Sequence, residues 1–111
     1  MCKAHCMRPQ RLGADELTSG LLQIPSWSRS RDIISRAIVY PSFLTAIEAV
    51  NRIATVAEEA DHHPDIDIRW RTVHLSLTTH DVGGLTELDL DLAGQIDAIT
   101  YELGGSPTSE A

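Results

Sequence analysis

Three histidines near the middle of the chain, His62, His63 and His80, have the side chains needed for acid–base chemistry. Imidazole titrates close to neutral pH, so it can donate and accept protons under physiological conditions. A neighbouring carboxylate fixes the tautomer of an imidazole and stabilises its charged form. Three carboxylates flank the histidines and could serve in this way: Glu58, Asp61 and Asp81. Residues 58–89 are therefore the candidate site of this chain.

Other kinds of catalytic site find little support in this stretch. It contains no cysteine, no serine elbow and no glycine-rich phosphate loop with a lysine. A metal site built from the three histidines and Asp81 is an alternative hypothesis, but adjacent histidines seldom converge on one ion. We therefore expect an acid–base site without a metal.

The size and charge of the chain limit what the site can belong to. With 111 residues, 42% of them hydrophobic and 23% charged, the sequence is typical of one globular domain that would gain stability from oligomerisation. Its net charge of −7 argues against direct binding to nucleic acid. No apolar run approaches the length of a membrane span, and the N-terminus lacks the apolar centre of a secretory signal. We expect a cytoplasmic homo-oligomer that contacts neither nucleic acid nor membranes.

The two ends of the chain are expected to be disordered tails. Residues 1–11 contain Cys2, His5 and Cys6, three possible soft metal ligands, but no fourth ligand stands nearby and terminal segments usually fray. Residues 104–111 begin with a Gly-Gly pair and have the composition of a disordered segment. The folded domain is therefore predicted to span residues 12–103.

Two segments in the first half have the hydrophobic period of amphipathic helices. The first spans residues 13–24 and is weakened by Gly20. The second spans residues 42–60 and must stop close to His63, because Pro64 disfavours helical backbone at the residue before it. Two apolar lines give the second helix a wide buried face: Phe43, Ile47, Val50, Ala54 and Ala57, and Leu44, Ala49, Ile53, Val56 and Ala60.

A third helix is predicted after residue 86. Thr86 is placed as its N-cap, with Asp89 three residues on, which is typical of a capping box. Its expected core stripe is Leu88, Leu92, Ile96 and Ile99.

Four strands are predicted between these helices. Residues 27–31 and 33–40 are expected to form an antiparallel pair. Two more strands lie between residues 65 and 79, with a tight turn near Arg71-Thr72, where the alternation of apolar residues changes phase. In them, His74 is expected to be structural or at the surface, and Trp70 to lie in the core or an interface. The element order predicts an α+β two-layer sandwich, a four-stranded antiparallel sheet with three helices on one face.

The spacing of these residues resembles the signature of the pterin-4a-carbinolamine dehydratases. The residues that match it are Glu58, His62, His63, Pro64, Trp70, His80 and Asp89. Around them, Ile24–Trp27 is similar to the family's Leu-Pro-x-Trp, and Thr79–Thr86 is similar to its Thr-His-Asp-x-Gly-Gly-Leu-Thr. The resemblance covers about residues 12–103.

The resemblance implies a lyase that acts on a pterin. Members of the family remove water from 4a-hydroxytetrahydropterin, the product left by aromatic amino-acid hydroxylases, and so support tetrahydropterin recycling. The product is the quinonoid dihydropterin, and neither a metal nor a bound cofactor is implied. The resemblance also implies a homodimer or homotetramer whose dimers share a continuous sheet.

Roles for individual residues follow from the same resemblance. His62 and His80 would form the acid–base pair, in an undecided order, and His63 would bind the pterin and assist. Four further residues are weaker assignments. Glu58 and Asp61 would orient the histidines or contact the ring, and Thr78 and Thr79 would offer backbone groups to the pterin edge.

A binding module is the alternative to an enzyme. Members of this family also serve as dimerisation partners of transcription regulators, and relatives act as assembly factors for other enzymes. The wide apolar face of residues 42–60 would suit helix docking. The presence of all three histidines favours the enzyme, because a protein that only binds a partner does not need them.

Overall fold

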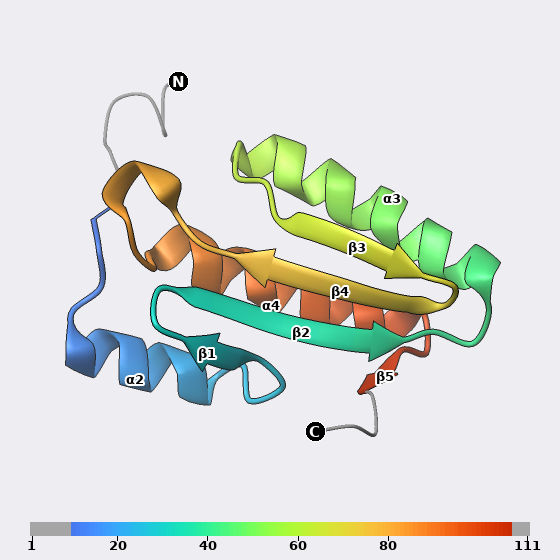
Figure 1. The fold of residues 1–111 in the computed structure, drawn as a ribbon, viewed down its shortest axis with the longest axis horizontal. Helices are drawn as coiled ribbons and strands as arrows, with labels where there is room; N and C mark the ends of the chain where they lie inside the picture. The colour runs from blue at the N-terminus through green and yellow to red at the C-terminus, as the bar shows by residue number, and fades with distance from the viewer. Residues whose placement is uncertain (1–9, 108–111) are drawn as a thin grey trace.

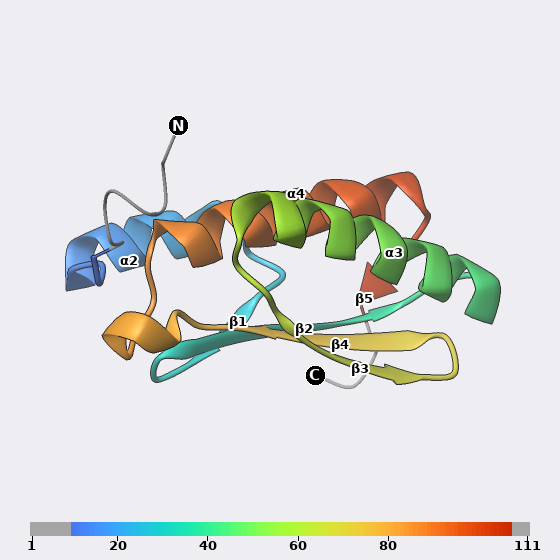
Figure 2. The same cartoon turned by 90° about the horizontal axis from the view of Figure 1, so that it is seen from above.

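The computed structural model describes residues 10–107, which form three α-helices over one antiparallel sheet (Figure 1). The elements in chain order are α2 (Ala14–Leu22), β1 (Ser28–Ser30), β2 (Ile33–Val39), α3 (Phe43–Ala60), β3 (Asp65–Arg69), β4 (Thr72–Leu77), the 3-10 helix η1 (His80–Val82), α4 (Glu87–Glu102) and β5 (Ser106–Pro107). All three α-helices lie on the same face of the sheet (Figure 2). The predicted α+β two-layer architecture is confirmed. Within residues 10–107, no helix is long and apolar enough to cross a membrane.

The sheet has the strand order β1-β2-β4-β3, and a short fifth strand pairs with β2. Strand β2 pairs with β4 from Ile34 to Val39, so β1 and β5 share its other edge. The prediction of a disordered tail from residue 104 is wrong for Ser106 and Pro107, which form β5. The main-chain pairing of these two residues with β2 is a contact between distant segments, which composition cannot reveal. Residues 108–111 and 1–9, including Cys2, His5 and Cys6, lie outside the described part.

Strands β3 and β4 form a hairpin with Trp70 and Arg71 in the turn. The predicted turn is therefore confirmed, one residue earlier than expected. Trp70 has a left-handed backbone, with φ 58°, and is 70% exposed. Trp70 therefore does not lie in the core, and its place in an interface stays a prediction. His74 is exposed in the middle of β4, as expected.

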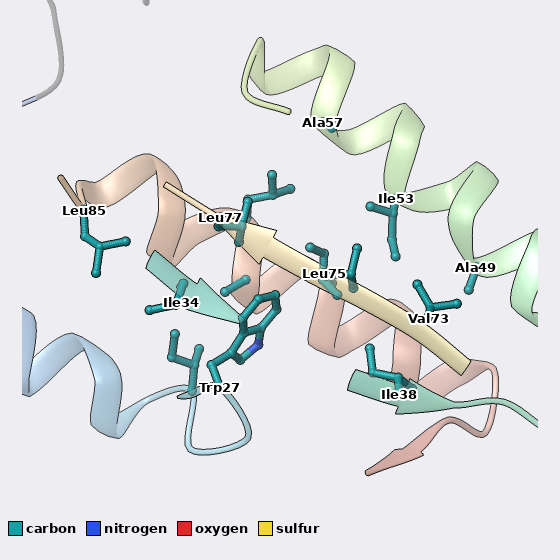
Figure 3. Close-up of a cluster of buried hydrophobic side chains, with 14 of the residues drawn as sticks. Trp27, Ile34, Ile38, Ala49, Ile53, Ala57, Val73, Leu75, Leu77 and Leu85 are labelled. Carbon is teal, nitrogen blue, oxygen red and sulfur yellow. The ribbon is translucent and has the colours of Figure 1, made fainter. Parts of the chain in front are cut away.

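The hydrophobic core fills the space between the sheet and the helices (Figure 3). Its sheet side comes from alternate residues of β2 and β4, because the register sets Ile38 opposite Val73 and Ile34 opposite Leu77. Its helix side includes residues from all three α-helices. The fully buried members are Ile34, Ile38, Tyr40, Ala46, Ala49, Ile53, Val73, Ala93 and Ile96. Burial raises the pKa of Tyr40, whose hydroxyl lies 3.0 Å from that of Thr100.

The face that α3 turns to the core is narrower than predicted, although three of its four buried residues belong to the two predicted lines. The helix begins after Ser42, whose hydroxyl accepts a hydrogen bond from the Thr45 N–H at 3.1 Å. Its buried residues are Ala46, Ala49, Ile53 and Ala57. Phe43 and Leu44 are instead 47% and 78% exposed. The alanines allow the helix to lie close to the sheet, and this packing places the two bulkier residues outside the core.

The buried face of α4 is also not the predicted one. Leu92 and Ile96 are buried as expected, but Leu88 and Ile99 are only half-buried. The face includes two buried polar residues, Asp89 and Thr100. A stripe of apolar residues cannot reveal such positions, because each polar residue is accommodated by a specific partner.

Candidate active site

The candidate site lies at one end of the sheet, where three segments meet. Helix α3 ends there, β4 runs into η1, and α4 begins (Figure 1). In the second view the start of α4 lies beside the end of α3, on the helix side of the sheet (Figure 2). Segments far apart in sequence can therefore contribute side chains to one place.

The end of α3 turns the chain sharply just before the histidine pair. Asp61 caps the helix with a left-handed backbone, φ 53°, and its N–H donates to the carbonyls of Ala57 and Glu58. The N–H of His62 donates to the carbonyl of Ala57 at 3.1 Å. The chain then continues without helical structure, and the two adjacent histidines reach different surroundings.

His62 is buried and paired with a carboxylate. Its Nε2 lies 2.6 Å from Oδ1 of Asp89, a residue on α4. His62 is 8% exposed and Asp89 is fully buried. A hydrogen bond to a carboxylate orients an imidazole and stabilises its charged form, and burial strengthens that electrostatic interaction. The contact with Asp89 thus fixes the orientation of the His62 ring.

Asp89 is itself held by the start of α4 and by the segment between β4 and η1. Its Oδ2 accepts hydrogen bonds from the backbone N–H of Thr86 at 2.9 Å and from the hydroxyl of Thr79 at 2.8 Å. The predicted capping box of Thr86 and Asp89 is confirmed, and it sets Asp89 in the first turn of α4, where the helix dipole favours negative charge. The buried carboxylate therefore has a hydrogen-bond partner on each oxygen.

His63 is also paired with a carboxylate, but at the surface. Its Nε2 lies 2.6 Å from Oε1 of Glu58, in the last turn of α3. The two side chains are 56% and 78% exposed. Glu58 thus contacts a histidine, as one of its expected roles requires.

His80 lies in the loop between β4 and α4. It is the first residue of η1 and is exposed. The loop is closed by two backbone hydrogen bonds between Thr79 and Gly84, at 3.1 and 3.3 Å, and by the left-handed backbone of Gly83, φ 64°. His80 therefore stands on a fixed turn one residue after Thr79, which contacts Asp89.

The comparisons with known proteins identify the family of this chain. The profile of the family described as Pterin 4 alpha carbinolamine dehydratase matches residues 10–99. The chain belongs to this family. A protein of Nocardia farcinica, provisionally named pterin-4-alpha-carbinolamine dehydratase, is 50% identical over 93 residues, which are 84% of this chain and 98% of the relative. A protein of Mycolicibacterium smegmatis with the same provisional name is 48% identical over 79% of this chain and 94% of its own length.

A solved structure also matches. The protein from Brucella melitensis described as a transcriptional coactivator/pterin dehydratase has a TM-score of 0.78 at 33% identity. The match covers 81% of this chain and 98% of that protein. The fold of this carbinolamine dehydratase family member is therefore shared with a solved relative.

The other residues predicted for substrate binding have partners within the chain. The Thr78 hydroxyl donates to the carbonyl of Asp32 at 2.6 Å, and the Thr79 hydroxyl donates to Asp89. The Thr79 backbone N–H and carbonyl are both engaged with Gly84. Asp61 caps α3 and is exposed. Contact of these residues with a pterin remains a prediction.

Asp89 is the contact of His62 that the sequence does not reveal. The sequence predicts Asp89 as part of a helix cap and as the last residue of the family signature, and not as the partner of His62. The signature spacing was the available signal, since a helix cap alone gives no reason for a fixed separation from the histidines.

The described residues do not bring together a set of metal ligands. Within residues 10–107, no group of three or more His, Cys, Asp or Glu side chains is placed to hold an ion. A hollow of about 420 Å³ lies on the open face of the sheet, away from the helices and the His62–Asp89 pair. Its lining is Asp65, Ile66, Asp67, Arg69, His74 and Ser76.

Proposed function

We propose that this protein dehydrates a 4a-hydroxytetrahydropterin to the quinonoid dihydropterin. Family membership supports a pterin reaction of this kind. The observation that carries the proposal is the buried pair of His62 and Asp89, whose 2.6 Å hydrogen bond equips the chain with an oriented proton-transfer group.

The proposed reaction needs one acid and one base. The acid protonates the 4a-hydroxyl as the C4a–O bond breaks and water leaves. The base removes the proton from N5, and the electron pair of the N5–H bond forms the new N5–C4a double bond. Atoms and charge balance without an oxidant, a reductant or a metal, so two imidazoles are sufficient.

His62 suits a role in which its charge changes. Because an ionised carboxylate can only accept hydrogen bonds, His62 donates from Nε2 to Asp89, and Nδ1 is the ring nitrogen left for a ligand. When Nδ1 takes a proton, Asp89 stabilises the resulting imidazolium. Of the three histidines, His62 is the one whose tautomer can be determined by a buried carboxylate of the protein.

His80 and His63 supply the second proton-transfer group and a contact for the substrate in this proposal. Both are exposed at the same end of the molecule, so a bound pterin could reach them. His80 is favoured as the partner of His62, because Thr79 connects the His80 loop to Asp89. His63, already paired with Glu58, is assigned to binding.

The test follows dehydration of 4a-hydroxytetrahydropterin, generated in situ by a hydroxylase, by absorbance. Wild-type protein should accelerate the reaction clearly above the spontaneous rate, and His62→Ala and His80→Ala should each lose most of that acceleration. His74→Ala is the matched control, because His74 is also exposed but faces the open side of the sheet. A folded wild-type protein without acceleration would disprove the proposal.

A second candidate function is binding of a protein partner, including a second copy of the chain. Its support is the exposure of Phe43, Leu44 and Trp70, which lie at the end of the molecule opposite the histidines. Exposed apolar residues of this size favour association. Light scattering should give the mass of a dimer or tetramer for wild-type protein and a smaller mass for Leu44→Asp. A monomeric wild type would remove self-association, and histidine variants should leave the mass unchanged.

A further inference from the structure

A row of buried hydroxyl groups lies behind the His62–Asp89 pair. The N–H of Leu88 donates to Oγ1 of Thr86 at 3.2 Å, and Oγ1 of Thr86 lies 2.8 Å from Oγ1 of Thr79. The Thr79 hydroxyl in turn donates to Oδ2 of Asp89 at 2.8 Å. Thr86 is fully buried and Thr79 is 4% exposed, so water does not compete freely for these groups.

The number of protons available determines which group donates and which accepts in each hydrogen bond of this row. Each hydroxyl has a single proton, and the Thr79 proton is used on Asp89. Thr79 must therefore accept from Thr86, which accepts in turn from the Leu88 N–H. Oδ2 of Asp89 then has two donors, Thr79 and the Thr86 N–H, and Oδ1 is left for His62. The row fixes which carboxylate oxygen faces the imidazole and leaves that oxygen as an acceptor.

We infer that Thr79 and Thr86 are positioning residues that keep the proton of neutral His62 on Nε2, so that Nδ1 faces the substrate. They act through Asp89 and need not touch the substrate. This assignment gives the Thr79 side chain a role that the predicted backbone contact with the pterin does not include. The expected effect of the two threonines on the dehydration rate rests on the proposed dehydratase function. Their expected effect on the tautomer of His62 does not depend on that function.

Thr79 also connects His62 to the loop that carries His80. Its side chain holds Asp89, while its backbone closes the turn through Gly84. One residue therefore fixes the orientation of one histidine and the position of the other. Loss of its hydroxyl should disturb His62 and leave the backbone of the His80 turn in place.

The test is the tautomer of His62, read by two-bond ¹H–¹⁵N correlation in protein labelled at histidine, at a pH where the spectrum shows a neutral ring. Wild type should give the Nε2–H tautomer, and Thr79→Val should give a mixture with Nδ1–H. Thr79→Ser keeps the hydroxyl and should restore the wild-type spectrum. Thr100→Val, another buried hydroxyl on α4 that contacts Tyr40, should change nothing at His62.

Asp89→Asn gives an independent reading if Thr79→Val does not fold. The two donors at Oδ2 require the amide oxygen at that position, so the amide NH₂ must face His62 and donate to Nε2. His62 should then switch to the Nδ1–H tautomer. If wild type has Nδ1–H, or if Asp89→Asn retains Nε2–H, the inference is wrong.

Activity separates this inference from the proposed function. Thr79→Val should lower kcat about tenfold, as expected for loss of a hydrogen bond to a charged group, with little change in KM. Thr79→Ser should recover most of the rate. A wild type that shows the Nε2–H tautomer but no dehydration would contradict the proposed function alone. An unchanged tautomer in Thr79→Val would contradict the inference even if the enzyme were active.

Discussion

Two histidine–carboxylate pairs with the same donor–acceptor distance stand side by side in this sequence and differ in nearly everything else. His62 lies 2.6 Å from Asp89 in the interior, and His63 lies 2.6 Å from Glu58 at the surface. The carboxylate of the first is fully buried, and that of the second is 78% exposed. The distance alone therefore does not distinguish a buried pair from one that is open to water and salt.

The difference arises from what stands behind each carboxylate. Asp89 accepts from two further donors, one at the start of α4 and one between β4 and η1, whereas Glu58 extends from the last turn of α3 into solvent. A surface ion pair gains little because water screens it and two long side chains must be ordered. A buried pair with every oxygen satisfied keeps its geometry, and its disruption leaves unpaired groups in the interior.

The sharpest way to separate the pairs is to neutralise each carboxylate. Asp89→Asn should lower kcat by roughly 10²- to 10⁴-fold, the range seen when the carboxylate that orients a catalytic imidazole is lost. Glu58→Gln should stay within about threefold, because an exposed hydrogen bond can be replaced by water. Steady-state kinetics of the two isosteric variants measures both. Equal losses would show that burial does not decide which pair matters.

The two pairs should also differ, by a smaller margin, in how much they contribute to the free energy of unfolding. Asp89→Ala removes the partner of His62 and the acceptor for Thr79 and Thr86, so the free energy of unfolding should fall by about 2–4 kcal/mol. Glu58→Ala should change it by less than about 0.5 kcal/mol, as is usual at the surface. Urea denaturation gives both values. Thr86→Ala, which removes the N-cap of α4, should lie between them at about 1–2 kcal/mol.

The smallest expected effect is the salt dependence of the exposed pair. A double-mutant cycle on His63 and Glu58 should give a coupling of about 0.2–1 kcal/mol at low salt that weakens towards 1 M. The same cycle on His62 and Asp89 should give a larger coupling that salt hardly changes. A surface coupling insensitive to salt would mean that Glu58 and His63 are held by more than each other.

The local chemistry of the sequence was sufficient for the order of the three α-helices and of strands β1 to β4. Pro64 ends α3 near the histidines, Ser42 begins it, and the Thr86–Asp89 capping box begins α4; each acts on neighbouring residues, so each can be read from the chain. The same holds for the alternation that gave β3, β4 and their turn.

Contacts between distant segments could not be predicted from local sequence chemistry. The α3 face chosen by alanine packing and the pairing of Ser106 with β2 both depend on which surfaces meet. Gly20 is a third case. The sequence predicts that Gly20 weakens α2, but a Cβ at this position would meet a terminal methyl of Leu90, so the glycine leaves room for this side chain of α4.

The site divides along the same line. The sequence by itself determined that three histidines stand among carboxylates, at a helix end and in a turn, because spacing and turn chemistry are local. Only the tertiary structure decided that Asp89 is the partner of His62 and that Glu58 is the partner of His63. After the left-handed turn at Asp61, the chain leaves the helix and places one histidine inward and the next outward. Burial, which separates the two roles, is a property of the assembled layers and not of either residue.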